Sequence, residues 1–318
     1  MEMLVTGLHH VTAIASNGQK NLDFYGGILG LRLVKKTINF DAPDVYHLYY
    51  GNESGSPGTI LTFFIFLDII KGKKGKGQLT VTSFSIPENS IDYWIKRLDK
   101  FHVKHQNPQQ RFNDEVFIYL EDFDGLGLEL VANKKDSRPP FSYGNIPLEH
   151  SIRGFYSITL SEECYEKTAH LLTEYMDHSL VVQKENRIRF STGGKPGEYV
   201  DILCVPDLFL GQGGTGTVHH VAYATANNKT QLQAREKLLK GGLNVTPVLD
   251  RQYFHSIYYR EPGGVLFEIA TIPPGFAIDE PLPHLGEQLK LPPWEEENRK
   301  ILERLLPPIH LQLKQFED

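Results

Sequence analysis

The chain has 318 residues, of which 40% are hydrophobic and 23% charged, a composition typical of a globular protein long enough for two domains. Its net charge of −6 gives no basic surface for nucleic acid, and its two cysteines are too few for a disulfide framework. No segment approaches the ~18 apolar residues of a membrane span or signal region. We therefore expect a cytoplasmic protein without a nucleic-acid or membrane partner.

A β-α-β-β-β unit is predicted four times along the chain. Each unit begins with a strand, continues with an amphipathic helix and ends with further strands. We expect Asn89 or Ser90 to cap the second helix and Ser161 to cap the third. The predicted elements are strand 8–15, helix 19–29, strands 32–40, 46–51 and 59–66; strand 79–86, helix 90–101, strands 117–120 and 126–131; strand 154–160, helix 162–175, strands 179–183, 187–191 and 199–204; strand 217–223, helix 228–240 and a last strand within 258–270.

The order of these units predicts an α+β chain with three segments. A Pro-containing loop at 134–149 separates an N-terminal pair of modules, residues 1–135, from a C-terminal pair, residues 150–272. The pattern changes at Pro273, so residues 273–318 are predicted to form a C-terminal arm with a helix over 294–306. The arm would cover a cavity mouth or pack between subunits, and both alternatives stay open.

The first strands of the units contain the most informative residues. They can be aligned at four positions, which are His10, Ser83, Ser157 and His220. Because side chains alternate along a strand, this register turns His10 and His220 toward a common cavity, rather than His9 and His219.

The last strands align on their Pro-Gly turns. This alignment places Phe63, Ile202 and Glu268 at one position, and unit two contributes Glu129 from the end of its strand. Units one and four are the pair that supplies two histidines and a carboxylate, so we predict that unit one packs beside unit four.

His10, His220 and Glu268 have the chemistry of a metal site with open positions. Two neutral imidazoles and one carboxylate form the facial triad that non-haem Fe(II) oxygenases use, and Mn(II) would also fit. A closed structural site would have a fourth protein ligand. Phe63, at the fourth aligned position, cannot provide one.

These residues lie in longer stretches that resemble a known family. The stretches are LHHVT (8–12), YHLYY (46–50), GSPGT (55–59), GTVHH (216–220), RQYF (251–254), YYREPGGVLFE (258–268) and DEP with HLGE (279–287). The chain resembles the vicinal oxygen chelate superfamily and, within it, the hydroquinone-type ring-cleaving dioxygenases. The resemblance implies four βαβββ modules in paired cupped mixed sheets.

The resemblance also implies a ligand set and a reaction. His10, His220 and Glu268 correspond to iron ligands, and His9, His219, Arg251 and Tyr258 to a polar surround. The expected partners are a small aromatic para-diol and O₂, in aromatic catabolism or quinone detoxification, and a homo-oligomer stays open.

Within that surround, Tyr258 and one of His9 or His219 are candidates for proton transfer, and Arg251 for stabilising an oxyanion. A role in orienting the metal ligands is an alternative for His9 and His219. The alternative for Tyr258 is a phenol packed in the core, and the alternative for Arg251 is a buried ion pair.

Two other classes of function stay open at the level of sequence. A glyoxalase-like lyase or isomerase would use the same cup, although that chemistry usually has four protein ligands. A metal-free binding protein of the resistance type would not need three complementary ligands.

Overall fold

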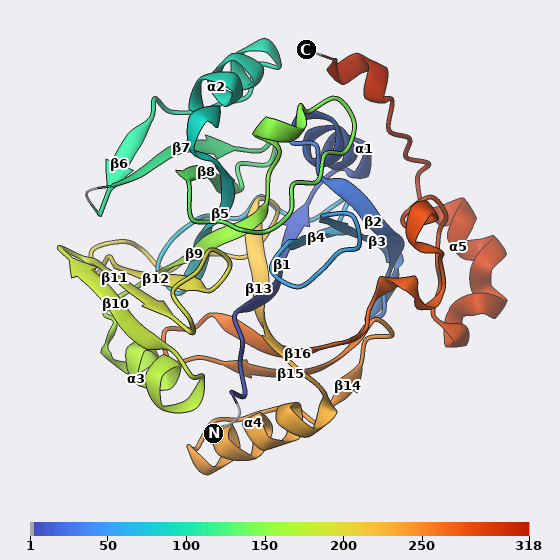
Figure 1. Cartoon of the computed structure of the whole chain (residues 1–318). Helices are drawn as coiled ribbons and strands as arrows, with labels where there is room; N and C mark the ends of the chain where they lie inside the picture. Colours follow the sequence, from blue (N-terminus) through green and yellow to red (C-terminus); the bar gives the residue numbers. More distant parts are fainter. Residues whose placement is uncertain (1–2, 113, 318) are drawn as a thin grey trace.

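The computed structural model describes residues 3–112 and 114–317 and contains two eight-stranded mixed sheets (Figure 1). The first sheet is built from β1 (Leu8–Ala15), β2 (Arg32–Asn39), β3 (Ala42–Gly51), β4 (Ile60–Ile65), β13 (Thr217–Thr225), β14 (Leu249–Asp250), β15 (Phe254–Arg260) and β16 (Leu266–Pro274). The second is built from β5 (Gln78–Pro87), β6 (Gln109–Arg111), β7 (Glu115–Glu121), β8 (Gly127–Asn133), β9 (Gly154–Glu162), β10 (Ser179–Lys184), β11 (Arg187–Ser191) and β12 (Tyr199–Cys204).

The order of strands joins the two ends of the chain in one sheet. It is β14-β15-β16-β13-β1-β4-β3-β2 in the first sheet and β10-β11-β12-β9-β5-β8-β7-β6 in the second. β1 pairs antiparallel with β13, with Val11 opposite Val221, and β5 pairs with β9 in the same way. The predicted fold of four modules in paired cupped sheets is confirmed, as is the pairing of unit one with unit four. The segments 1–135 and 150–272 each give one module to each sheet.

The first strand of a module is central in its sheet, and both of its faces are covered. All eight residues of β1 are buried. Val11, Ala13 and Ala15 belong to the main hydrophobic core, whereas His10 and Thr12 alternate with them on the other, concave face. Alternation therefore separates the residues that stabilise the fold from those that line the cup.

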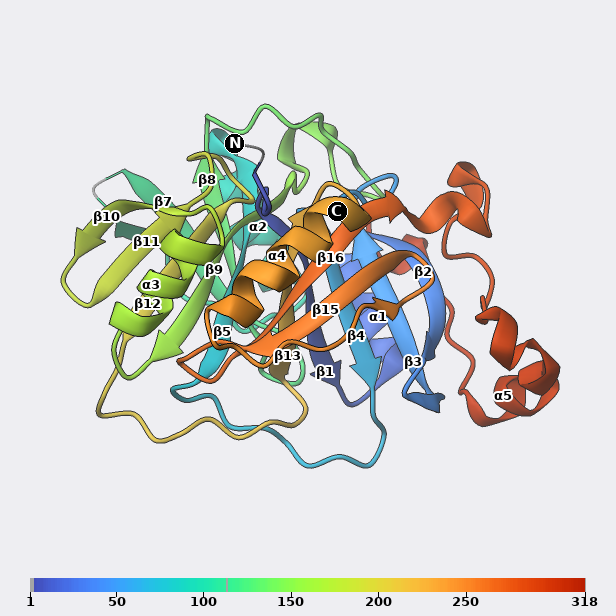
Figure 2. The same cartoon turned by 90° about the horizontal axis from the view of Figure 1, so that it is seen from below.

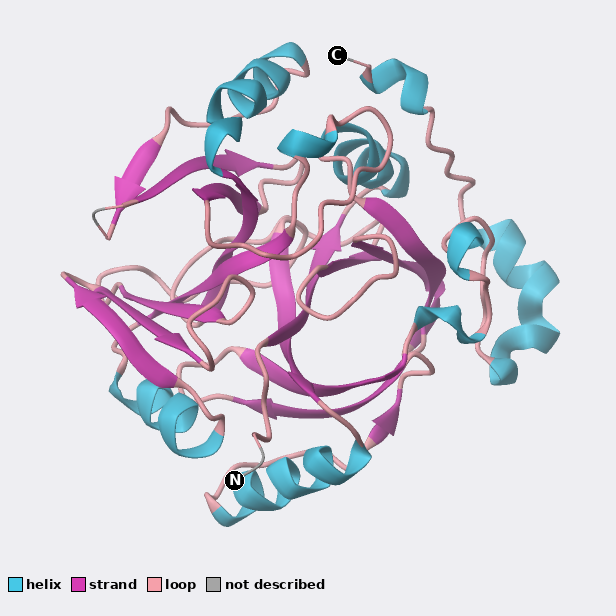
Figure 3. Ribbon diagram, in the orientation of Figure 1, coloured by secondary structure: helices cyan, strands magenta, loops and turns pink. Residues whose placement is uncertain are grey.

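The helices lie around the outside of the two sheets (Figure 3). They are α1 (Gly18–Leu22), α2 (Ile91–Lys100), α3 (Glu166–Tyr175), α4 (Asn228–Lys240) and α5 (Arg299–Leu305). α4 has its predicted bounds because Asn227 caps it, accepting hydrogen bonds from the amides of Lys229 and Thr230. The first predicted helix continues beyond α1 as a π-helical segment, Asp23–Ile28.

One predicted helix cap is wrong, and the other, Ser90, stands at the N-cap position without a capping hydrogen bond. Ser161 does not cap α3 because β9 continues to Glu162, and the Ser161 hydroxyl lies 2.7 Å from that of Thr80 instead. α2 begins at Ile91 without a side-chain cap, since the Ser90 hydroxyl bonds to His150 at 3.0 Å. In both places a tertiary hydrogen bond replaces the local one that the sequence suggested.

The C-terminal arm follows the outside of the first sheet beyond β2 and β3 (Figure 2). Its residues Phe276 and Leu285 pack in a second hydrophobic cluster with Tyr49 and Phe254, two residues of the concave face. The fully buried Lys35 ammonium holds the arm, at 2.5 Å from carboxylate oxygens of both Asp279 and Glu280. The arm thus packs behind residues that line the cup, and none of its described residues lines the cavity itself. No helix in the described part of the chain is long and apolar enough to cross a membrane.

Candidate metal centre

Three ligand atoms converge on the concave face of the first sheet. The Nε2 atoms of His10 and His220 lie 3.2 Å apart, and Glu268 Oε2 lies 3.3 Å from the first and 3.0 Å from the second. Octahedral coordination at about 2.1 Å places neighbouring ligand atoms about 3.0 Å apart. His10, His220 and Glu268 therefore have the spacing of three ligands on one face of a metal ion.

The nitrogen and oxygen atoms of this cluster are better suited to binding a cation than to hydrogen bonding with one another. Glu268 is fully buried, and its Oε2 has no hydrogen-bond donor. Burial by itself would raise the pKa of Glu268, but His10 and His220 hold that pKa well below its usual value. A divalent cation in the space between these atoms would offset the free-energy cost of burying the carboxylate charge beside two imidazole lone pairs.

The second ring nitrogen of each candidate ligand faces the preceding histidine. His10 Nδ1 lies 2.9 Å from His9 Nδ1, and His220 Nδ1 lies 2.7 Å from His219 Nδ1. A histidine that binds metal through Nε2 carries its proton on Nδ1, so His10 and His220 would each donate to their neighbour. His9 also hydrogen-bonds to the backbone of Thr271. With a metal bound, the doubled histidines would thus fix the tautomer and orientation of the two candidate ligands.

The structure places His9 and His219 differently. His9 is buried and is not among the residues that line the cavity; burial, followed by the nearby His10, lowers its pKa to about 3. His219 lines the cavity and is exposed to it, and its pKa is lowered to about 4 by partial desolvation and then by His220. Of the two, His219 is the one that can contact a molecule in the cavity.

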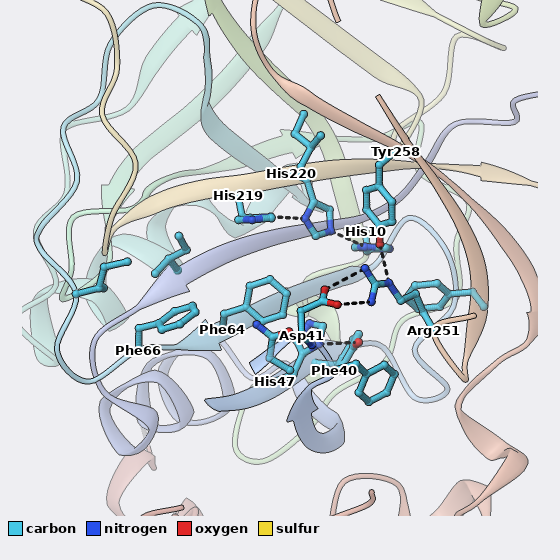
Figure 4. Close-up of a pocket in the computed structure, with 16 residues that line it drawn as sticks. His10, Phe40, Asp41, His47, Phe64, Phe66, His219, His220, Arg251 and Tyr258 are labelled. Carbon is cyan, nitrogen blue, oxygen red and sulfur yellow. Dashed lines mark hydrogen bonds and ion pairs between the residues drawn. The ribbon is translucent and has the colours of Figure 1, made fainter. Parts of the chain in front are cut away.

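The open side of the triad faces a cavity of about 430 Å³ (Figure 4). Arg251 and Tyr258 line it, and Arg251 Nε donates to the Tyr258 hydroxyl at 3.2 Å. Burial and the charge of Glu268 raise the pKa of Tyr258, so its hydroxyl stays protonated. Arg251 also pairs with Asp41 of the β2–β3 turn, with 3.1 Å between Nη2 and Oδ2.

Several cavity residues were not predicted from the sequence. Besides Asp41, they include His47 and Tyr49 on β3, where the His47 ring lies 2.9 Å from the Tyr49 hydroxyl and 2.8 Å from that of Thr62. Burial, and then the charges of nearby His10 and His220, keep the pKa of His47 well below its usual value. The alternation of His47 with Tyr49 was a signal for one face of a strand, but it did not say which face.

The predicted alignment of the last strands is wrong by one residue. Ala222 pairs with Glu268, and the equivalent Thr12 pairs with Thr62, so Thr62 rather than Phe63 stands opposite the carboxylate. The turn before β16 contains one glycine more than the turn before β4, Pro262-Gly263-Gly264 against Pro57-Gly58, which shifts the register. Thr62 offers a hydroxyl and no carboxylate, so the triad still lacks a fourth protein ligand of the usual kind.

Two corrections of the predicted alignment apply to the second sheet, one in its last strands and one in the first strand of unit two. Asp201, which pairs with Thr159, occupies the position predicted for Ile202. Glu129 pairs with Ser83, which makes Ser83 equivalent to Thr12 and not to His10. Arginines neutralise both carboxylates, with Arg111 Nη2 at 2.8 Å from Glu129 and Arg189 Nε at 2.6 Å from Asp201. The carboxylates on the concave face of the second sheet are therefore held in ion pairs.

Comparison with known proteins agrees with this geometry. A family model described as "Glyoxalase/Bleomycin resistance protein/Dioxygenase superfamily" matches residues 7–130. MhqO of Bacillus subtilis, named "Putative ring-cleaving dioxygenase", is 42% identical over 96% of this chain and 97% of its own length. The chlorohydroquinone/hydroquinone 1,2-dioxygenase of Sphingobium indicum is 34% identical over 92% of this chain and 93% of its own.

Solved structures show the same fold. A crystal structure described as a "putative dioxygenase" from Bacillus subtilis superposes with a TM-score of 0.93 at 42% identity, covering 98% of this chain and 99% of the other. Glyoxalase I from Zea mays superposes with a TM-score of 0.62 at 11% identity, covering 83% and 92%. The second match concerns the fold alone.

Fold and site together define a class: a protein of the vicinal oxygen chelate fold with a His-His-Glu cluster that could hold a metal ion. More narrowly, the chain belongs to the ring-cleaving dioxygenases of the glyoxalase, bleomycin-resistance and dioxygenase superfamily, because its relatives match it over nearly its whole length.

Proposed function

We propose that this protein is an Fe(II)-dependent dioxygenase that cleaves the ring of a hydroquinone-type diol with O₂, in aromatic catabolism or quinone detoxification. The observation that carries the proposal is the three-atom cluster of His10, His220 and Glu268, whose open side faces a cavity lined by Arg251 and Tyr258. The name of the Sphingobium relative supports the choice of hydroquinones.

His10, His220 and Glu268 would hold the iron, with Mn(II) as the alternative ion. Bound Fe(II) would acidify a ligated phenol and accept O₂ at a neighbouring open position. Because His10, His220 and Glu268 would hold the ion from one side, the cavity would leave room for the substrate and O₂ next to each other, which would supply the proximity contribution to the rate.

The cavity residues provide the polar contacts that a second, para hydroxyl needs. Tyr258 keeps its proton and can donate it to a substrate oxygen, while Arg251 remains charged and holds the Tyr258 hydroxyl in place. His219 reaches the cavity and can accept or pass on a proton. His9 acts through His10 by fixing the orientation of its ring.

An oxygen-electrode assay on protein purified without air and loaded with Fe(II) tests the proposal. A catechol chelates a metal through adjacent oxygens, whereas a hydroquinone offers one oxygen and needs polar groups for the other. Methyl- or chloro-hydroquinone should be consumed at least about tenfold faster than the matching catechol, equal to about 1.4 kcal/mol in barrier.

The alternatives predict other results in the same assay. Faster uptake with catechols would assign the protein to extradiol cleavage. Absence of uptake with every diol, despite one bound metal ion, would favour a lyase or isomerase of the glyoxalase type. Absence of metal binding would leave a small-molecule binding protein.

A further inference from the structure

The cavity has two ends with different chemistry. The metal cluster, Arg251 and Tyr258 form its polar end. The side away from Arg251, which we name the apolar arm, is lined by Ile14, Phe64, Phe66, Ile69 and Leu266. The arm begins beside the metal cluster, since the Phe64 and His220 ring centroids are 6.4 Å apart. Figure 4 shows Phe66 on the far side of the cavity from Arg251 and Tyr258.

Strand geometry places the apolar arm toward one end of the first sheet. On three strands, an apolar lining residue stands two positions from a polar residue of the cup. The pairs are Thr12 and Ile14 on β1, Thr62 and Phe64 on β4, and Glu268 and Leu266 on β16. Because β4 is parallel to β1 and β16 runs opposite to it, all three steps lead toward the same end of the sheet. Two residues of strand correspond to about 6.6 Å.

The cavity is larger than an unsubstituted diol requires. An apolar cavity of about 150 Å³ is enough to bind benzene. The volume here is about 430 Å³. A hydroquinone with one oxygen at the metal cluster and the other near Arg251 and Tyr258 leaves the apolar arm unfilled.

The lining also selects against a charged group in that arm. Asp41 and Arg251 are the charged residues among those described as lining the cavity, apart from the histidines, and they pair with each other. Leu67 and Ile70, on either side of Ile69 in the chain, are exposed apolar residues outside the cavity lining. A charged substituent would lose its hydration in the arm without gaining a partner.

We infer that the preferred substrate is a para-hydroquinone with an apolar substituent of several carbons, bound along the apolar arm. This inference rests on the proposed function and adds which diol the site selects. Filling the arm places the ring against the metal cluster and removes apolar surface of the substrate from water.

The test is a series of 2-alkylhydroquinones from methyl to n-butyl, with 2-carboxyhydroquinone as the charged member. Oxygen uptake at limiting substrate gives kcat/KM for the Fe(II)-loaded protein. Each added carbon should raise kcat/KM about fourfold, the factor to which about 0.8 kcal/mol for a buried methylene corresponds. The carboxyl compound should react more slowly than the methyl one.

A pair of variants locates the effect. Ile69→Asp puts a charge at the arm and should reduce the ratio of butyl to methyl kcat/KM to near one. Ile70→Asp changes the next residue, which is exposed and does not line the cavity, and should keep the ratio of the unmodified protein. Ile14→Phe, which fills the arm from β1, should lower the same ratio.

Binding to the metal-free protein separates this inference from the proposed function. Anaerobic calorimetry should give a lower Kd for butyl- than for methylhydroquinone, and Ile69→Asp should remove the difference. Methylhydroquinone cleavage with no gain along the series would overturn the apolar arm and leave the proposed function. Absence of oxygen uptake with every diol would overturn the proposed function. The order of Kd values would still decide whether the apolar arm binds the alkyl substituent.

Discussion

Glu268 presents one oxygen to His10 and His220 because Ser256 holds the other. The Ser256 hydroxyl, on β15, donates to Glu268 Oε1 at 2.5 Å, and both side chains are fully buried. A buried carboxylate with one oxygen fixed has little freedom to rotate away from the histidines. Ser256 thus orients the Glu268 carboxylate, as His9 and His219 orient the two imidazoles.

Ser256→Ala should weaken metal binding about 10- to 100-fold, which is the usual effect of removing a group that orients a metal ligand. Titration against a chelator of known affinity measures the change. Ser157→Ala is the matched control, because Ser157 is equally buried but lies in the second sheet with an unpaired hydroxyl. Equal metal affinity in Ser256→Ala and the unmodified protein would show that packing alone orients Glu268.

Individual residues differ in how far the sequence predicts them. His10, His220 and Glu268 could be singled out because duplication repeats the surrounding pattern. Asp41 could not, since its partner Arg251 is 210 residues away and no local periodicity connects a turn in one module with a loop in another. Whether the three candidate ligands bind iron stays a prediction.

At the scale of elements, turn length decides which residues share a position. Strand content and most strand bounds follow from alternation, but the extra glycine at Gly263-Gly264 moved the predicted counterpart of Glu268 from Thr62 to Phe63. A shift of one residue in a strand exchanges its two faces. Phe63 consequently packs in the core against Tyr25, with 4.5 Å between ring centroids, while Thr62 bonds to Thr12 and His47 on the concave face.

Another contact between elements joins the two sheets through a pair of carboxyl groups. Glu162 ends β9 of the second sheet, and Glu261 lies in the turn before β16 of the first. The hydroxyl of Thr168, on α3, is 2.7 Å from Glu162 and 2.6 Å from Glu261. Burial, and then the charge of Glu261, raise the pKa of Glu162 to about 8.

This pair should make the protein less stable as pH rises from about 4.5 to about 8. In that range the folded state keeps a proton that the unfolded Glu162 has released, so the free energy of unfolding falls with pH. Glu162→Gln should flatten the dependence and add at least about 1 kcal/mol at pH 8, the value of about one pKa unit.

Urea unfolding at several pH values from 5 to 8.5 measures the effect. Glu174→Gln, a change at an exposed position of the same helix α3 that carries Thr168, serves as the control and should leave the pH dependence unaltered. The same slope in Glu162→Gln as in the unmodified protein would contradict the assignment of the pH dependence to Glu162.

On the scale of the whole molecule, the site depends on the pairing of modules that are far apart in the chain. The sequence predicted this pairing by chemistry, since units one and four are the pair with two histidines and a carboxylate. It did not predict the place of the arm. The contact of Lys35 with Asp279 and Glu280 joins β2 to a segment without a periodic pattern, and packing rather than propensity fixes it.

Because both sheets cross the boundary between the sequence halves, cutting the connecting loop should not separate them. A protease site inserted between the exposed Pro139 and Pro140 allows the folded protein to be cleaved there. The halves should still elute together in size-exclusion chromatography, held by the β1–β13 and β5–β9 pairs, and should retain metal.

After separation in denaturant, the N-terminal fragment has His10 without the other two candidate ligands, and the C-terminal fragment has His220 and Glu268 without His10. Neither fragment alone should bind metal tightly, because each lacks at least one of the three ligands of the facial triad. Mixing the fragments and removing denaturant should restore binding. Fragments that come apart after the cut in native buffer, or a C-terminal fragment that binds metal as tightly as the full chain, would show that the cup does not need both ends of the chain.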